Sequence, residues 1–197
     1  MQLYVLTDIW GKTKSLEQWV AKLSHALPTV NQVVLSPYDT LQSSENVHFK
    51  SEQHAYQYFS DNVGLEAYCE YVRSQLLTTI EPVIVVGFSA GGSAIWRLSE
   101  DKSIAKKVNQ AFCFYSSQVR HSLILVPNFP VTYIAPASEP GFDITDITDI
   151  LRQKDNVEVE QTPYLHGFMN ARSINFNPQG LTQFTSKIET CIQQVQG

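Results

Sequence analysis

Residues 82–98 read PVIVVGFSAGGSAIWRL, and this stretch decides the predicted fold. An apolar run at 83–86 has the length and composition of a buried strand, and it ends abruptly in GFSAGG at 87–92. Apolar side chains then recur at helical spacing. The order strand, G-x-S-x-G, helix is the context of a nucleophile elbow, in which a serine occupies a tight, strained turn. The stretch therefore predicts that Ser89 is a candidate nucleophile.

The remainder of the chain alternates short apolar strands with amphipathic helices. Strands are expected at 2–7, 32–36, 83–86, 111–115, 131–135 and 157–161, and helices at 16–27, 52–59, 65–77, 90–102, 144–151 and 181–195. Strands that alternate with helices imply right-handed crossovers and a mostly parallel sheet with helices on both faces. No linker or shift in composition interrupts the pattern, so we expect one α/β domain over residues 1–197.

Composition excludes several classes of function. The net charge of −5 carries no basic cluster, which argues against nucleic-acid binding. The apolar runs are too short to span a bilayer, and the first residues, MQLYVLTDIWG, do not resemble a secretory signal. The three cysteines are widely spaced and form no metal-ligand pattern. We therefore expect a cytoplasmic protein that needs no metal or cofactor and does not associate with membranes.

A serine hydroxyl becomes a strong nucleophile only when a base accepts its proton, and an acid must orient that base. In chains with a nucleophile elbow the order is serine, acid, histidine. Only His121 and His166 follow Ser89. His166 lies in PYLHGFMN, between the last expected strand and the last helix, at the sheet edge where ligands bind in open α/β folds. His166 is the preferred base, and His121, in the polar stretch VRHS, is the weaker candidate.

Two carboxylates follow the strand at 131–135, in the stretch PASEPGFDITD. Asp143 precedes a periodic apolar face and has an ordinary role as a helix N-cap. Glu139 has no such local role and lies on the loop directly after the strand. Glu139 is therefore the preferred acid, and Asp143 is the alternative.

Acyl transfer also needs hydrogen-bond donors for the developing oxyanion. One is expected to be the backbone N–H of Ala90, directly after the serine. The loop TDIWG at 7–11 follows the first strand and offers the other, through Ile9 or Trp10.

Together these motifs resemble the dienelactone hydrolase-like family of α/β-hydrolases. The resemblance extends over most of the chain and rests on DIWG at 8–11, SPYD at 36–39, GFSAGG at 87–92, CFYS at 113–116 and HGFMN at 166–170. It implies an α/β-hydrolase fold with little or no lid, an open site or one partly covered by residues 40–62, and no cofactor.

The resemblance also implies roles for individual residues. Ser89 would be the nucleophile and His166 the base, with Glu139 in the place of the acid. The N–H groups of Ile9 and Ala90 would form the oxyanion hole.

The chain departs from the family pattern at two places. The enzymes that give the family its name use cysteine as nucleophile, where this chain has serine. They also bind a substrate carboxylate through an arginine near the catalytic histidine. Asn170 stands at that spacing here, and Arg172 is two residues further on. Dienelactone is therefore not the expected substrate.

We expect a serine hydrolase that cleaves a small carboxylic ester or thioester through an acyl-enzyme. An inactive hydrolase scaffold with a binding role is the main alternative. A flavodoxin-like nucleotide binder is a third, although the chain lacks both G-x-G-x-x-G and the P-loop lysine.

Overall fold

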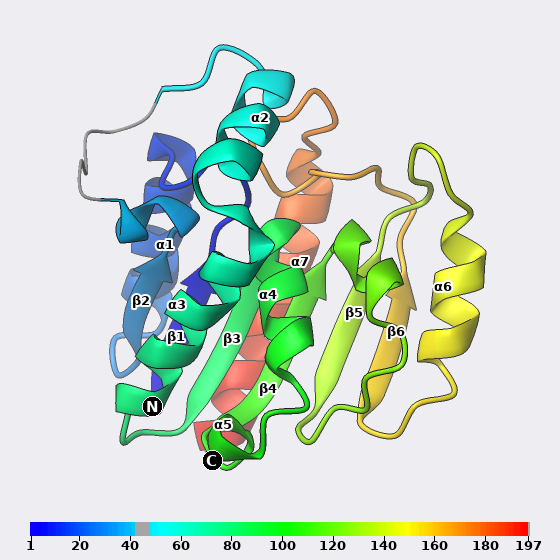
Figure 1. Cartoon of the computed structure of the whole chain (residues 1–197). Coiled ribbons are helices and arrows are strands. Elements are labelled where there is room, and N and C mark those ends of the chain that lie inside the picture. The colour runs from blue at the N-terminus through cyan, green and yellow to red at the C-terminus, as the bar shows by residue number, and fades with distance from the viewer. Residues whose placement is uncertain (42–47, 197) are drawn as a thin grey trace.

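A computed structural model describes residues 1–41 and 48–196. Within them the strands form one six-stranded sheet in the order β2-β1-β3-β4-β5-β6, and every neighbouring pair is parallel (Figure 1). The strands are β1 (Gln2–Leu6), β2 (Asn31–Leu35), β3 (Val83–Phe88), β4 (Val108–Phe114), β5 (Val131–Ala135) and β6 (Val157–Gln161). The predicted parallel sheet is confirmed.

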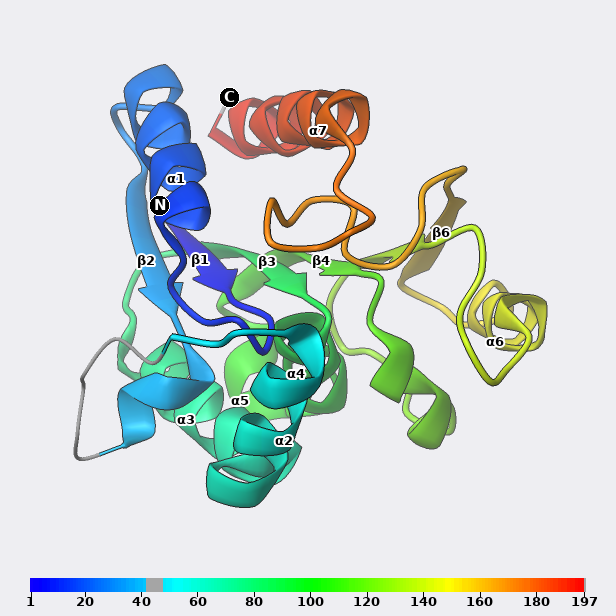
Figure 2. The same ribbon diagram turned by 90° about the horizontal axis from the view of Figure 1, so that it is seen from above.

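Helices cover both faces of the sheet, as predicted. Figure 2 shows α1 and α7 together above one face and α2, α3, α4 and α5 below the other. The helices are α1 (Lys14–Ala26), α2 (Glu52–Asn62), α3 (Gly64–Thr78), α4 (Ala90–Leu98), α5 (Lys102–Ala105), α6 (Ile144–Leu151) and α7 (Pro178–Gln196). Two 3-10 helices, η1 (Pro37–Thr40) and η2 (Ser117–His121), follow β2 and β4.

The helix after the elbow is shorter than predicted. The sequence suggested a helix to residue 102, but α4 ends at Leu98 and α5 is a separate turn. The reason is Asp101, whose carboxylate accepts a 2.7 Å hydrogen bond from the Ser103 N–H and caps the start of α5.

The strands alternate their side chains between two apolar layers. In β3, Val83 and Val85 belong to the core under α3, α4 and α6. Ile84 and Val86 belong to the opposite core, under α1 and α7. Every residue of β3 is buried, as expected for a central strand of a parallel sheet. Because side chains alternate along a strand, neighbouring residues of β3 point to opposite faces of the sheet.

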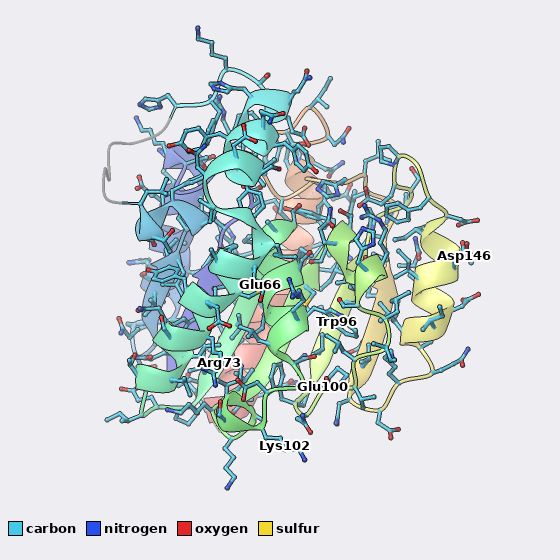
Figure 3. The ribbon with its side chains drawn as sticks, viewed as in Figure 1. Glu66, Arg73, Trp96, Glu100, Lys102 and Asp146 are labelled. Atoms are coloured by element: carbon cyan, nitrogen blue, oxygen red, sulfur yellow. The ribbon has the colours of Figure 1, made fainter. Side chains whose placement is uncertain are left out.

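The packing of α3 against α4 fixes the helix that follows the elbow (Figure 3). Trp96 on α4 is fully buried, and its indole N–H donates to the Ser122 carbonyl at 3.2 Å. On the outside, Glu66 of α3 pairs with Arg97 of α4, and Arg73 of α3 pairs with Asp101, each at 2.6 Å. These exposed ion pairs contribute little, so apolar burial holds the helices together.

Two further expectations concern membranes and cysteines. In the described part of the chain no helix is long and apolar enough to cross a bilayer. Cys69, Cys113 and Cys191 are free thiols, and the first two are buried.

Candidate active site

Ser89 lies on a sharp turn between β3 and α4, at the carboxyl end of the central strand. Its backbone has φ of 48° and ψ of −104°, a conformation that is unusual for a residue with a Cβ. Two hydrogen bonds hold it: its N–H donates to the Phe114 carbonyl at 2.9 Å, and its carbonyl accepts from the Ser93 N–H at 2.9 Å. The serine predicted from the G-x-S-x-G motif therefore has the strained geometry of an elbow.

Two glycines make this turn sterically feasible. A Cβ at Gly91 would lie 2.4 Å from the Leu6 carbonyl oxygen on β1. A Cβ at Gly87 would lie 2.5 Å from the Gly92 nitrogen. Both distances are far below van der Waals contact, so only glycine lets α4 start this close to the sheet.

His166 and Glu139 converge on Ser89. Nε2 of His166 lies 3.2 Å from the Ser89 Oγ, and its Nδ1 lies 2.6 Å from Oε1 of Glu139. Glu139 comes from the loop after β5 and His166 from the loop after β6, where Gly167 turns the chain with φ of 82°. The side chains of His166 and Glu139 are 24% and 4% exposed, so the carboxylate is shielded behind the imidazole.

The two alternatives from the sequence lie elsewhere. Asp143 is exposed and caps α6, where it accepts a 2.8 Å hydrogen bond from the Thr145 N–H that lowers the pKa of its carboxyl. His121 is exposed at the end of η2. Neither contributes to the wall of the cleft around Ser89.

The predicted oxyanion donors lie beside the serine. Ile9 and Ala90 both line the cleft that contains Ser89. Trp10 was the alternative to Ile9, but its N–H donates to Oδ1 of Asp8 at 2.9 Å. The N–H groups of Ile9 and Ala90 donate to no group within residues 1–41 and 48–196. Of the two candidates in the loop at 7–11, Ile9 rather than Trp10 keeps an N–H that donates to no described residue.

The active-site cleft has a volume of about 840 Å³ and lies between the strand ends and α2. Its apolar wall is formed by Ile9, Phe59, Leu65 and Leu165. Two carboxylates, Glu52 and Glu139, also line it, and no lysine or arginine of the described residues does so.

Part of the segment at 40–62 covers the cleft, as predicted, because α2 forms one of its walls. Residues 42–47 of that segment lie outside the described residues. Within the described ranges, no group of three histidine, cysteine or acidic residues is arranged to hold a metal ion.

The arginine near His166 turns away from the cleft. The Arg172 guanidinium lies 4.9 Å from the ring centroid of Trp10 and donates to the Phe49 carbonyl at 2.7 Å. Phe49 in turn packs against the rings of Trp10 and Tyr38, at centroid distances of 6.4 and 5.4 Å.

Sequence reasoning missed the burial of Asp8. Its side chain accepts 2.6 and 2.9 Å hydrogen bonds from Nδ2 of Asn170 and the N–H of Trp10, and the residue is 8% exposed. Burial raises the pKa of Asp8 to about 6, against the lowering by those two hydrogen bonds and by His166. Glu52 adds a smaller rise. The only sequence signal was the position of an aspartate directly after an apolar strand.

No family model matches the chain. Over 173 residues it is 30% identical to the uncharacterized protein YczH of Bacillus subtilis strain 168, and the match covers 86% of this chain and 81% of that protein. The chain belongs to the YczH family.

Solved structures share its fold. A putative dienelactone hydrolase from Klebsiella pneumoniae superposes with a TM-score of 0.72 at 12% identity, over 95% of this chain and 84% of that one. The dienelactone hydrolase-like promiscuous phosphotriesterase P91 from metagenomic libraries gives 0.67 at 9% identity, over 98% and 85%. Est1E from Butyrivibrio proteoclasticus with ferulic acid bound gives 0.62 at 9%, over 98% and 88%. The predicted α/β-hydrolase fold is confirmed.

The raised pKa of Asp8 predicts a pH-dependent stability. The folded protein retains this proton between its ordinary pKa of 3.8 and about 6, whereas the unfolded chain releases it. Stability contributed by Asp8 is therefore lost as the pH rises through that window, by about 3 kcal/mol in total. Denaturant unfolding from pH 4 to pH 7 covers most of this window, so the free energy of unfolding of the wild type should fall by about 2.4 kcal/mol relative to that of Asp8→Asn. Parallel curves for the two proteins would contradict the prediction.

Proposed function

We propose that the chain is a serine hydrolase that cleaves a small carboxylic ester or thioester through an acyl-enzyme. The observation that carries the proposal is the chain of contacts from Ser89 through His166 to Glu139, at 3.2 and 2.6 Å, on a strained elbow. A nucleophile, a base in contact with it and an acid that orients the base are the three parts that such catalysis requires. The fold shared with hydrolases and esterases supports the same chemistry.

In the proposed reaction His166 Nε2 accepts the proton of Ser89 as Oγ attacks the substrate carbonyl carbon. Glu139 stabilises the imidazolium through Nδ1. The oxyanion forms within reach of the Ile9 and Ala90 N–H groups, and one such donor contributes about 3 kcal/mol to the transition state. His166 then protonates the leaving alcohol or thiol. Finally it activates a water that cleaves the acyl-enzyme, releases the acid and regenerates the serine.

The charge of the cleft favours an uncharged substrate. Glu52 and Glu139 line it, without a lysine or arginine from the described residues to offset them. A substrate with its own carboxylate would be repelled, which agrees with the absence of a cleft arginine near His166. Est1E holds the aromatic acid ferulic acid, which makes neutral aryl esters reasonable first substrates. The comparisons do not favour the alternative of an inactive scaffold.

A fluorophosphonate probe tests the proposal directly. The probe should label Ser89 of the purified protein, as identified by peptide mass spectrometry, because only an activated serine reacts rapidly. Ser89→Ala should abolish labelling, and His166→Ala should slow it by about 10³-fold or more. His121→Ala is the matched control and should label at the wild-type rate. A folded wild-type protein that does not react would favour the inactive scaffold instead.

The choice between the two carboxylates predicts a kinetic difference. Glu139→Gln should lower kcat for p-nitrophenyl acetate by about 10³- to 10⁴-fold, because the amide no longer holds the imidazolium. Asp143→Asn should leave kcat unchanged, since asparagine caps a helix about as well as aspartate. The reverse result would assign the acid to Asp143.

The acidic cleft predicts selectivity by charge. With p-nitrophenyl acetate, kcat/KM should exceed that for mono-p-nitrophenyl succinate by about tenfold or more, or on the order of 1.4 kcal/mol. Glu52→Gln removes one negative charge from the cleft, so it should reduce the ratio of kcat/KM for the neutral ester to that for the anionic ester. Asp146→Asn, which removes a carboxylate on α6 outside the cleft wall, should leave it unchanged. A preference for the anionic ester would refute the assignment of substrate charge.

A further inference from the structure

A second cavity lies on the opposite side of the strand ends from the active-site cleft. It has a volume of about 470 Å³ and is walled by α1 on one side and α7 on the other, the two helices that share one face of the sheet (Figure 2). This α1/α7 cavity and the cleft have no lining residue in common. Its size falls in the range of small-molecule sites.

One carboxylate at the floor of the α1/α7 cavity has unused binding capacity. Asp8 is buried and forms no ion pair within the described ranges. Among the described residues its side chain accepts hydrogen bonds from the Asn170 amide and the Trp10 N–H, and a carboxylate can accept more than two. A buried anion without a positive partner destabilises the protein, and a cationic ligand would supply that partner.

The walls are apolar and aromatic. Trp19 of α1 packs edge-on against Phe88, at a centroid distance of 5.6 Å, and both line the cavity with Met169 and Leu181. The Trp19 indole N–H donates to Thr185 Oγ1 of α7 at 2.8 Å, which fixes the ring between the two helices. Such walls suit an aromatic body, and an indole also favours a nearby cation.

We propose that the α1/α7 cavity binds a small primary amine with an aromatic body, whose ammonium group pairs with Asp8. An ammonium supplies what the floor lacks, namely a positive charge and further hydrogen-bond donors for the carboxylate. A neutral alcohol would satisfy the hydrogen bonds but leave the anion uncompensated. At pH 7.5 the carboxyl, with its pKa of about 6, is mostly ionised.

Isothermal titration calorimetry at pH 7.5 with benzylamine, benzyl alcohol and benzoate tests the proposal. Benzylamine should bind at one site with a dissociation constant of about 1 mM or lower. Benzyl alcohol should bind about tenfold more weakly, and benzoate should not bind. Equal affinity for the amine and the alcohol would overturn the assignment of ligand class, and no heat from benzylamine would overturn the site.

Variants locate the binding. Asp8→Asn should weaken benzylamine binding by about tenfold. A variant of the cavity wall tests the site even if Asp8→Asn does not fold. Thr182→Trp should block the cavity from α7, whereas Thr190→Trp, on the same helix outside the cavity, should leave binding unchanged.

One more variant separates the two sites. Leu165→Trp narrows the active-site cleft without touching the α1/α7 cavity, so it should not change benzylamine binding. Binding that survives Thr182→Trp but is lost in Leu165→Trp would assign the amine to the cleft and overturn the proposal. Because the calorimetry does not depend on hydrolysis, its result stands whether or not the chain cleaves esters.

Discussion

The contact between Gly91 and the carbonyl of Leu6 is the constraint on which the site depends. Helix α4 starts directly after Ser89, so its first turn must pass over β1, and only a residue without a Cβ fits there. This close approach forces the serine into a left-handed conformation that costs about 1–3 kcal/mol. The buried packing of α4 against α3 and β3 offsets that cost. In return Ser89 lines the cleft, and the N–H of Ala90 at the start of the helix donates to no described residue.

Consecutive side chains at the strand ends point to opposite faces of the sheet, so they line two separate sites, the α1/α7 cavity and the cleft. After β1, Asp8 faces the α1/α7 cavity while its neighbour Ile9 faces the cleft. At the end of β3, Phe88 faces the α1/α7 cavity and Ser89 faces the cleft. Tyr115 forms part of the partition, with its ring 5.0 Å from that of His166. The two sites have no lining side chain in common, but this contact joins a residue of the cavity to a residue of the cleft.

Features that depend on residues close together in the sequence could be predicted from it. The sheet, the helices and the turn at Ser89 follow from apolar periodicity and from glycines whose role is local. His166 and Glu139 were preferred because parallel strands bring their following loops to one edge. Asp143 is the second candidate for the acid, because capping is also a local role.

Other features depend on contacts between segments that are distant in the sequence, and local sequence patterns carry little signal for them. The α1/α7 cavity needs Trp19 and Thr185 to meet between the two helices on one face of the sheet. The burial of Asp8 depends on Asn170, which reaches it from the loop after β6. The direction of Arg172 is set by Trp10 and Phe49, and no spacing rule includes those contacts. The break between α4 and α5 is the exception, because Asp101 was a local cap that the apolar pattern concealed.

The stacking of Arg172, Trp10 and Phe49 ties together three segments that surround the cleft. Arg172 belongs to the loop that carries His166, Trp10 to the loop that carries Ile9, and Phe49 to the approach to α2. Movement of one segment therefore strains the other two. These contacts restrict the three segments in the unliganded protein, so less conformational entropy would be lost if a ligand bound the cleft. Such a site selects molecules by fit to a fixed shape rather than by closing around them.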